Sequence, residues 1–200
     1  MRLRPAFKGL ALLFLAACTA SEPPLVHGSG FQGLDDHPDG PSVTLFTVVS
    51  KRSGTGAHSG LLITTLESKI LFDPAGSFAL SYVPERNDVH FGITSQIVET
   101  YIDYHARETY DVIAQRVPVT AAQADQIAQL AKDYGPVPRA QCALSINRIL
   151  QKVQGFERMT PSFFPVATSQ RFGMADNVTR RVITDTDADA NGSVLQAAGP

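Results

Sequence analysis

The sequence predicts an α+β domain in which helices pack on a small antiparallel sheet. Apolar, β-branched runs separated by turn signals predict the strands, and two capped stretches with helical spacing predict the helices. Hydrophobic residues make up 44% of the 200 residues, which is enough for one core. This length therefore predicts one domain, over residues 42–175, with extended segments on either side.

The chain begins with the layout of a bacterial lipoprotein signal. Three basic residues precede a short apolar run that ends in Leu15-Ala16-Ala17-Cys18. Small residues directly before a cysteine are typical of a signal cleaved where a lipid is attached. The run is too short for a permanent transmembrane helix, which needs roughly 20 apolar residues. Residues 1–17 are therefore predicted to be a signal peptide, and Cys18 the lipidated N-terminus that anchors the chain.

Two polar segments flank the predicted domain. Residues 18–41 are rich in Pro, Gly, Ser, His and Asp, which predicts a tether between the lipid and the domain. Residues 176–200 contain Asp, Ala, Asn and Gly without a sustained period, which predicts a disordered tail.

The net charge and the residue after the lipidated cysteine bear on the partners and the location of the chain. Loss of the signal leaves 14 basic residues against 19 acidic ones, a formal net charge of about −5, and basic clusters interleaved with aromatics are absent from the sequence. This composition argues against a nucleic-acid partner. In bacterial lipoproteins an Asp after the cysteine commonly signals inner-membrane retention. Thr19 stands there instead, which resembles lipoproteins on the periplasmic face of the outer membrane.

Four strands are predicted from apolar and alternating runs. The first covers residues 43–49. Residues 61–64 and 69–72 form a predicted hairpin around the polar turn 65–68, and residues 110–117 form a further strand.

Two helices are predicted from their caps. Thr94 is the expected cap of a helix that carries Ile97, Val98, Tyr101 and Ile102. Thr120 and Gln123 form a capping box in front of a second apolar stripe, made of Ala124, Ile127, Ala128 and Ala131. Gly135-Pro136 is expected to end this helix, because Gly adopts the left-handed cap and Pro cannot continue a helix.

A third helix is expected to begin near Ala140, to continue through Val153 and to stop at Gly155. Cys142 then lies in its first turn, where unpaired N–H groups and the helix dipole favour a thiolate. The segment 161–174 contains three phenylalanines and is expected to pack back on the domain.

Cys142 is the second of two cysteines, so lipidation of Cys18 leaves it as the lone thiol of an exported chain. A lone thiol in an oxidising compartment needs a reason, and a catalytic nucleophile is one. Such a thiol requires a base, usually histidine, and a third polar group that orients the imidazole. The chain offers His27, His37, His58, His90 and His105, of which the first two fall in the tether.

His58 is the best candidate base, because it lies at the start of a predicted strand, where the backbone fixes the direction of its side chain. If a four-residue loop pairs Ile63 with Ser68, the register places His58 directly opposite Asp73. Opposed side chains share a face about 5 Å apart at Cβ, which suits an aspartate that orients a histidine. A slip of one residue would move Asp73 to the other face of the sheet.

Three short segments carry a family resemblance: Ala57-His58-Ser59-Gly60-Leu61-Leu62-Ile63, Ile70-Leu71-Phe72-Asp73 and Gln141-Cys142-Ala143-Leu144. Together they resemble the circularly permuted papain-like superfamily, which includes relatives of NlpC-type peptidoglycan peptidases and of lecithin–retinol-acyltransferase-like enzymes. The likeness covers residues 43–153. The aromatic residue often found soon after the family cysteine is absent, and Leu144-Ser145-Ile146 stands there instead.

The resemblance implies a role for each residue and an activity for the chain. Cys142 corresponds to the nucleophile, His58 to the base and Asp73 to the variable third polar residue, and the backbone N–H of Cys142 would help to bind the oxyanion. The implied activity is that of a periplasmic, lipid-anchored cysteine hydrolase or acyltransferase. Its substrate would be an amide or ester, with cell-wall peptide or an acyl group as the candidate classes.

A non-catalytic alternative remains open at the level of sequence. Cys142 shares a predicted helical face with Ile146, Ile149 and Val153, so it is equally expected as a small buried core residue. In that case the chain is a non-catalytic binding or scaffolding lipoprotein of the cell envelope.

No cofactor and no metal site are predicted. Residues 28–33 match a dinucleotide-binding glycine pattern, but they lie in the tether, away from any predicted strand or helix. Residues 187–192 resemble the start of a calcium loop, yet position twelve is Ala198, where the loop requires a glutamate. His90 and His105 are not expected to converge on one ion.

Overall fold

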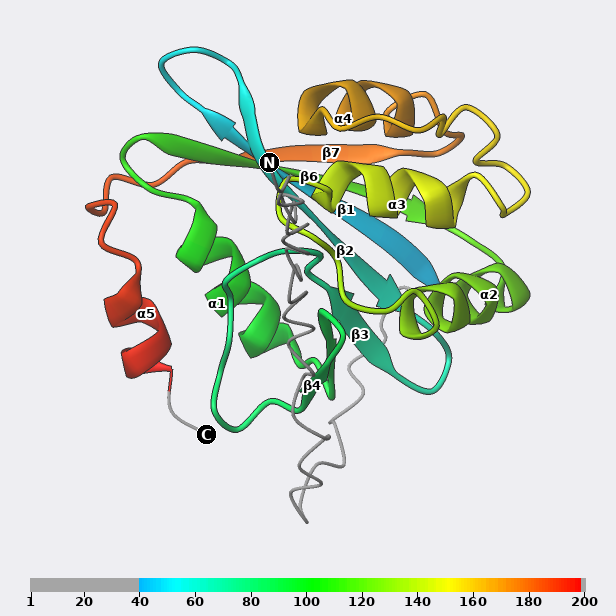
Figure 1. Cartoon of the computed structure of the whole chain (residues 1–200), viewed down its shortest axis with the longest axis horizontal. Helices are drawn as coiled ribbons and strands as arrows, with labels where there is room; N and C mark the ends of the chain where they lie inside the picture. Colours follow the sequence, from blue (N-terminus) through cyan, green and yellow to red (C-terminus); the bar gives the residue numbers. More distant parts are fainter. Residues whose placement is uncertain (1–39, 199–200) are drawn as a thin grey trace, which may run out of the picture.

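The computed structural model describes residues 40–198, which form a mixed fold of helices around one antiparallel sheet (Figure 1). Within this range the sheet has seven strands in the order β4-β5-β3-β2-β1-β6-β7, and there are five helices. The strands are β1 (Ser42–Ser50), β2 (Gly56–Thr64), β3 (Lys69–Phe72), β4 (Glu85–Arg86), β5 (Val89–Phe91), β6 (Tyr110–Pro118) and β7 (Thr179–Ile183). The helices are α1 (Ser95–His105), α2 (Ala121–Lys132), α3 (Cys142–Leu150), α4 (Pro165–Phe172) and α5 (Gly192–Ala197).

The predicted signal peptide, Cys18 and nearly all of the predicted tether lie outside the described residues. Among residues 40–198, none of the helices is both long enough and apolar enough to cross a membrane.

The four predicted strands are confirmed as β1, β2, β3 and β6, and β1 lies near the centre of the sheet. It pairs over its whole length with β6 on one side and, apart from an irregularity after Val48, with β2 on the other. Its alternate side chains enter two different clusters, Leu45 in one and Phe46 in the other. Both faces of the sheet are therefore covered, which explains the nearly continuous apolar run in this strand.

The predicted register of the β2–β3 hairpin is wrong by two residues. Thr64 pairs with Lys69 and Leu61 with Phe72, so Ile63 does not face Ser68 and Asp73 does not lie directly opposite His58. The cause is the side chain of Thr65, whose Oγ1 accepts the N–H groups of Glu67 and Ser68 and closes the loop one residue later on each strand. Because the shift is two residues, Asp73 stays on the same face as His58.

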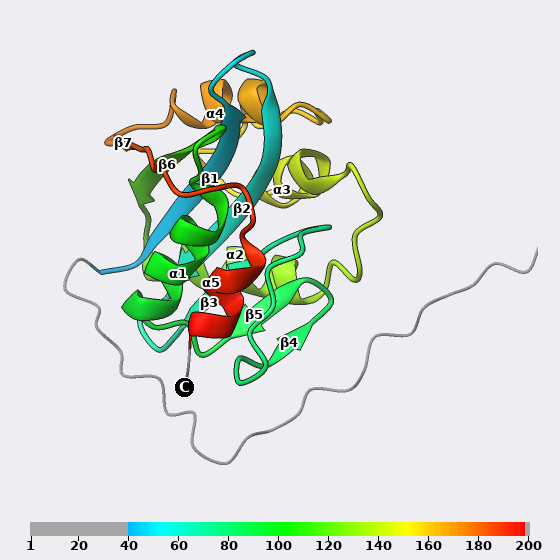
Figure 2. The ribbon, with the colours of Figure 1, turned by 90° about the vertical axis from the view of Figure 1, so that its left-hand side faces the viewer.

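The helices divide into two layers. Residues of α2, α3 and α4 pack in one cluster against one face of the sheet, whereas α1 and α5 contribute to the cluster on the other face. Figures 1 and 2 show this division, with α5 lying against α1 on the side away from α3.

The helix caps explain where these helices begin. Thr94 Oγ1 accepts the N–H of Ile97, and Thr120 and Gln123 form the predicted capping box. At its other end α2 stops at Lys132, three residues before Gly135, which has the expected positive φ of 83°. The third predicted helix begins at Cys142 and ends at Leu150, so its first turn is where the sequence placed it and its end is earlier than expected.

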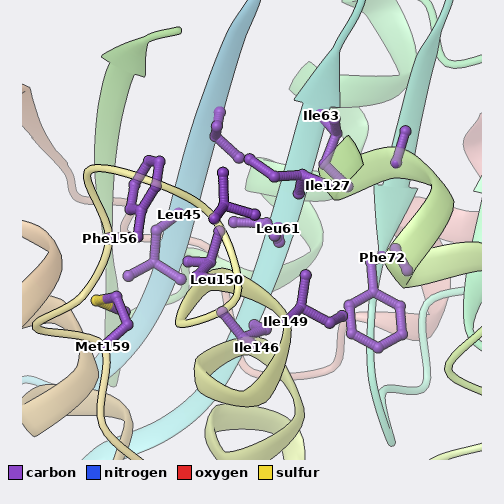
Figure 3. Packing of buried hydrophobic residues seen from close by; sticks show 14 of the residues in the cluster. Leu45, Leu61, Ile63, Phe72, Ile127, Ile146, Ile149, Leu150, Phe156 and Met159 are labelled. Atoms are coloured by element: carbon purple, nitrogen blue, oxygen red, sulfur yellow. The ribbon is translucent and has the colours of Figure 1, made fainter. Parts of the chain in front are cut away.

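The core beneath α2 and α3 is mostly aliphatic. Figure 3 shows Ile146, Ile149 and Leu150 of α3 directed at Leu45 of β1 and Leu61 of β2. All five side chains are at most 1% exposed. This burial fixes α3 against β2, and with it the position of Cys142 at the start of the helix.

The prediction of a disordered tail from residue 176 does not hold for the described part of that segment. Thr179–Ile183 is strand β7, which pairs antiparallel with β6 from Arg116 to Val112. Four of its five residues are exposed, so backbone pairing holds the strand in place and an apolar pattern is lacking. The segment after it continues along α1 and ends in α5.

Of the predicted 161–174 segment, Pro165–Phe172 forms α4, and Phe172 is fully buried under it. Phe163 and Phe164 remain exposed at its start. A Cβ at Gly56 would overlap Pro165, so this end of α4 lies directly against the beginning of β2.

Candidate active site

The site lies at the edge of β2 that β3 leaves uncovered. The last pair of the hairpin is Leu61 with Phe72, so residues 56–60 of β2 extend beyond β3. The first turn of α3 occupies this position, because the backbone N–H of Ser59 interacts with the sulfur of Cys142. The ends of two strands and a helix N-terminus therefore meet here, and the nucleophile candidate lies beside the strand that carries His58.

The structure brings His58, Asp73 and Cys142 together. His58 Nε2 lies 2.6 Å from Asp73 Oδ1, and the Cys142 thiol is close enough to the imidazole to raise its pKa. Because Nε2 is engaged with the carboxylate, Nδ1 is the nitrogen left for the sulfur. Asp73 is 2% exposed and Cys142 is 6% exposed, while the His58 side chain keeps 14%. This is the order of contacts that a nucleophile, a base and an orienting acid require.

Tyr101 is a fourth member of this group, and it was not predicted from the sequence. Its hydroxyl donates a 2.7 Å hydrogen bond to Asp73 Oδ1, the oxygen that also faces His58. The ring is 1% exposed and packs on Phe46, with the ring centroids 5.4 Å apart. Burial and the neighbouring carboxylate raise the pKa of Tyr101 well above its ordinary value, so the hydroxyl remains a donor at any physiological pH. Asp73 is thereby held from two sides.

Two glycines make room for this carboxylate. A Cβ at Gly60 would overlap the Tyr101 hydroxyl, and a Cβ at Gly76 would overlap the carboxylate of Asp73. Gly76 closes a turn in which its N–H donates to the backbone carbonyl of Asp73. Neither glycine needs a positive φ, so close approach is the reason for the absence of a side chain at both positions.

The charges of the pair favour a thiolate and an imidazolium. Burial alone would lower the pKa of His58, but the charge and hydrogen bond of Asp73, together with Cys142, raise it to about 10. Burial alone would raise the pKa of Cys142, but the hydrogen bond and charge of His58 lower it below its ordinary value, helped by the N–H groups of Ser59 and Ala143. Although burial opposes its ionisation, Asp73 has a pKa well below the usual range because His58 is adjacent.

His105 stacks on the candidate base. Its ring lies 5.4 Å from that of His58, at an interplanar angle of 8°. Its Nδ1 lies 2.9 Å from the carbonyl oxygen of Tyr101, and a carbonyl only accepts, so Nδ1 carries the hydrogen. Burial, with the nearby charges of His58 and Arg107, lowers the pKa of His105 to about 4. His105 is therefore neutral, and it can stack on an imidazolium without charge repulsion.

The other histidines considered as bases are not near the thiol or cannot be placed. His90 is buried in β5 and faces Glu85, with Nδ1 3.7 Å from Oε2. His27 and His37 lie outside the described residues. Tyr101 and His105 could have been found together from the sequence, since they are four residues apart and share a face of the predicted helix.

Among residues 40–198, two groups of side chains could approach a metal ion. The ligand atoms of His58, Asp73 and His105 lie within 4.8 Å of one another. However, His58 Nε2 and Asp73 Oδ1 are 2.6 Å apart, whereas two ligands on one tetrahedral zinc lie about 3.3 Å apart. A metal would therefore have to displace the proton that these two atoms share. The second group is Asp103, Asp185 and Asp187, of which the first and last pair with Arg107.

The N-terminus of α3 can stabilise negative charge. Its N-cap residue, Gln141, makes no side-chain hydrogen bond to the helix, so this residue does not occupy the first-turn N–H groups as a capping side chain usually does. The N–H groups of Ser59 and Ala143 point at the sulfur instead. The same end of the helix presents the N–H of Cys142, the donor expected for an oxyanion.

A cavity of about 260 Å³ opens beside His58 and His105 on the α1 side of the sheet. A larger groove of about 560 Å³ lies between α1 and the far end of the sheet, and none of Cys142, His58 or Asp73 lines it. The cavity next to the candidate base is therefore the smaller one.

The chain matches no protein-family model, no curated protein and no solved structure. The geometry of the site is therefore what supports catalytic roles for Cys142, His58 and Asp73, and these roles stay predictions.

Proposed function

We propose that this protein is a cysteine hydrolase or acyltransferase that acts on an amide or ester. The observation that carries the proposal is the continuous chain of contacts from Cys142 through His58 to Asp73, with Tyr101 on the same carboxylate oxygen. A buried structural cysteine would have no need of an adjacent imidazole whose pKa is about 10 or of a buried aspartate behind it.

The proposed chemistry starts from the thiolate of Cys142. The sulfur attacks the carbonyl carbon of the substrate, and the negative charge moves to the carbonyl oxygen, which accepts a hydrogen bond from the backbone N–H of Cys142. When the carbon–nitrogen or carbon–oxygen bond breaks, His58 gives its proton to the leaving group. A water or an acceptor alcohol or amine then loses its proton to His58, attacks the thioester and releases Cys142.

Asp73 and Tyr101 are positioning residues in this scheme. Asp73 accepts from Nε2 and keeps Nδ1 directed at the sulfur, and it stabilises the imidazolium whenever His58 is protonated. The Tyr101 hydroxyl fixes the carboxylate in the orientation that this contact needs.

The chain order supports the permuted papain-like type within this proposal. A strand with the base comes first, the orienting acid follows the next strand, and the helix with the nucleophile comes much later. We further propose attachment through a lipid on Cys18 to the periplasmic face of the outer membrane, where cell-wall peptides and acylated molecules are the available substrates.

Two measurements test the proposal. The first is the rate at which iodoacetamide alkylates Cys142 in the folded chain as a function of pH, followed by mass spectrometry of the peptide that contains Cys142. Alkylation is expected to persist well below pH 8 and to fall in His58→Ala. Alkylation only after unfolding would contradict the proposal and favour a non-catalytic binding or scaffolding lipoprotein.

The second measurement is acetyl transfer from p-nitrophenyl acetate. The folded protein should release one equivalent of nitrophenol in a burst and carry an acetyl group on Cys142. Cys142→Ser is the matched control, because it keeps the size of the side chain while the hydroxyl has no lowered pKa. A burst of equal size in that variant, or its absence in the wild type, would overturn the proposal.

A further inference from the structure

The cavity beside His58 has a wall made by the C-terminal segment. Asp189 and Asn191 line it together with His105, Arg107 and the hydroxyl-bearing Ser77. These two residues come from the part of the chain after β7, far in sequence from the rest of the site. The C-terminal segment is therefore part of the surroundings of the candidate base.

The position of this cavity suits the leaving group of a substrate better than its acyl group. His58 lines it and Cys142 does not. In acyl transfer the base must lie within hydrogen-bond reach of the leaving atom, because it protonates that atom. The leaving group of the substrate would consequently extend into this cavity, and so would the acceptor that later attacks the thioester. The acyl portion stays with the sulfur.

Several hydrogen bonds fix the C-terminal segment in this place. The N–H of Glu108 donates to the carbonyl oxygen of Asp187 over 2.8 Å, and Lys51 Nζ donates to that of Asp185 over 2.7 Å. Thr109 Oγ1 donates to the Asp189 carboxylate over 2.8 Å. Asn191 Nδ2 donates to the carbonyl oxygen of Tyr104 over 3.3 Å. The wall is thus held by contacts along both its backbone and its side chains.

The charges of the cavity point to the kind of group it takes. Arg107, which is 4% exposed, is balanced by Asp103 at 3.1 Å and Asp187 at 3.5 Å. Asp189 accepts from Thr109 only, and within residues 40–198 it makes no ion pair with a lysine, arginine or histidine. Its carboxylate is therefore the uncompensated charge at the mouth of the cavity. A ligand with a cation at this point would complement it.

We propose that this cavity is the leaving-group and acceptor subsite, and that it takes a small polar amine-bearing group whose ammonium binds Asp189 while its reacting atom faces His58. The inference rests on the proposed function and adds a substrate class to it. A volume of about 260 Å³ limits the group to one amino acid or one amino sugar in size. Asp189 and Asn191 are then specificity residues supplied by the C-terminal segment.

The test compares two acceptors of the acetyl-enzyme formed from p-nitrophenyl acetate. 1,2-Diaminoethane and propylamine have the same number of heavy atoms, and each offers a neutral amine that can attack the thioester. The attacking nitrogen gives its proton to His58, the acetyl amide is released and the thiol is restored. Only the diamine has a second, protonated nitrogen for Asp189. The measured quantity is the ratio of the two acceptors' second-order rate constants.

Asp189→Asn is the informative variant, since the amide oxygen can still accept from Thr109 while the charge is removed. Its diamine-to-propylamine ratio should fall about threefold to fivefold, the size expected for an exposed ion pair. Asp125→Asn, which removes an exposed charge on α2, should leave the ratio unchanged. An unchanged ratio in Asp189→Asn overturns the subsite even if the acetyl-enzyme forms normally. Failure of the wild type to form any acetyl-enzyme overturns the proposed function itself, so the two failures are distinguishable.

Discussion

The two faces of the sheet differ in what they bury. Beneath α2, α3 and α4 the buried polar side chains are neutral, such as Asn147 of α3 and Thr168 of α4, and the core around them is mostly aliphatic. Beneath α1 the buried groups include Asp73, His90 and Arg107, surrounded by aromatic rings. One face resembles an ordinary core, and the other holds charge in a low-dielectric setting.

This difference means that one face of the sheet mainly stabilises the fold, whereas the other face holds the charged groups of the candidate site. The helix with the candidate nucleophile is positioned by the aliphatic face, while the candidate base, Asp73 and Tyr101 belong to the other face. The two meet only where β3 has ended and the edge of β2 is open. Substitutions on the two faces should therefore have separable effects on stability and on reactivity.

Cys142→Ala should produce the largest effect. It removes the proposed nucleophile, so acetyl transfer should fall by roughly 10⁴-fold or more, to the background rate of the reagent. The free energy of unfolding should change little, because only one small side chain is shortened. The measurements are burst kinetics and urea unfolding. Retained turnover in this variant would show that another residue of the chain attacks the carbonyl.

Ile149→Ala should lower the stability of the fold and leave the reactivity of Cys142 unchanged. The side chain is 1% exposed in the aliphatic core, so its truncation should lower the free energy of unfolding by about 2–5 kcal/mol. The pH profile of Cys142 alkylation should be unchanged under conditions where the variant is folded. Ile149→Val is the milder control, with an expected cost of about 0.5–1.5 kcal/mol. A shifted pH profile in either variant would contradict the separation of the two faces.

Asp73→Asn tests the charge on the other face. Burial lowers the pKa of His58 and the carboxylate raises it, so removal of the carboxylate should make that pKa fall well below about 10. The pKa of Cys142 should then rise, and alkylation at pH 6 should slow about 10-fold to 100-fold. Imidazole NMR signals and alkylation rates measure the two changes. A His58 pKa that stays near 10 would mean that Asp73 is not what stabilises the imidazolium.

The raised pKa of the His58 imidazole also makes the free energy of unfolding depend on pH. The pKa of His58 is raised from 6.5 to about 10 on folding, so its contribution to stability is fully present below pH 6.5 and is lost as the pH rises through about 10. Urea unfolding between pH 6 and pH 10.5 should show this loss in the wild type. The slope should be absent, or much reduced, in His58→Gln.

Tyr101→Phe should have the smallest effect. It removes one of the two donors to Asp73 Oδ1 and leaves the ring in place, so acetyl transfer should slow by about 10-fold, the loss of one hydrogen bond to a charged group. Tyr104→Phe is the matched control on the same helix, because its hydroxyl contacts Ser77 and not Asp73. Equal losses in both variants would indicate a general packing effect on α1.

The sequence was informative where the signals are local. The capping box at Thr120, the nearly continuous apolar run of β1 and the place of Cys142 in a first helical turn depend on residues a few positions apart, and all three agree with the structure. His58 and Asp73 could be paired because they flank one hairpin, although the side chain of Thr65 sets a register different from the expected one.

Features that depend on distant contacts could not be predicted. Tyr101 reaches Asp73 from a separate helix, and Gly76 owes its lack of a side chain to that same carboxylate. β7 lacks an apolar pattern because pairing with β6 holds it, so Thr179–Ile183 resembled a polar tail. In each case the deciding partner lies far away in sequence, where periodicity gives no information.

The recessed position of Cys142 also affects its redox lifetime. A thiolate with a lowered pKa is readily oxidised to sulfenic acid by small peroxides. With 6% of its surface exposed, however, the sulfur is out of reach of the bulky thiols and disulfides of other proteins. In an oxidising compartment the recess should therefore protect the chain from mixed disulfides and from covalent dimers, while leaving it sensitive to hydrogen peroxide.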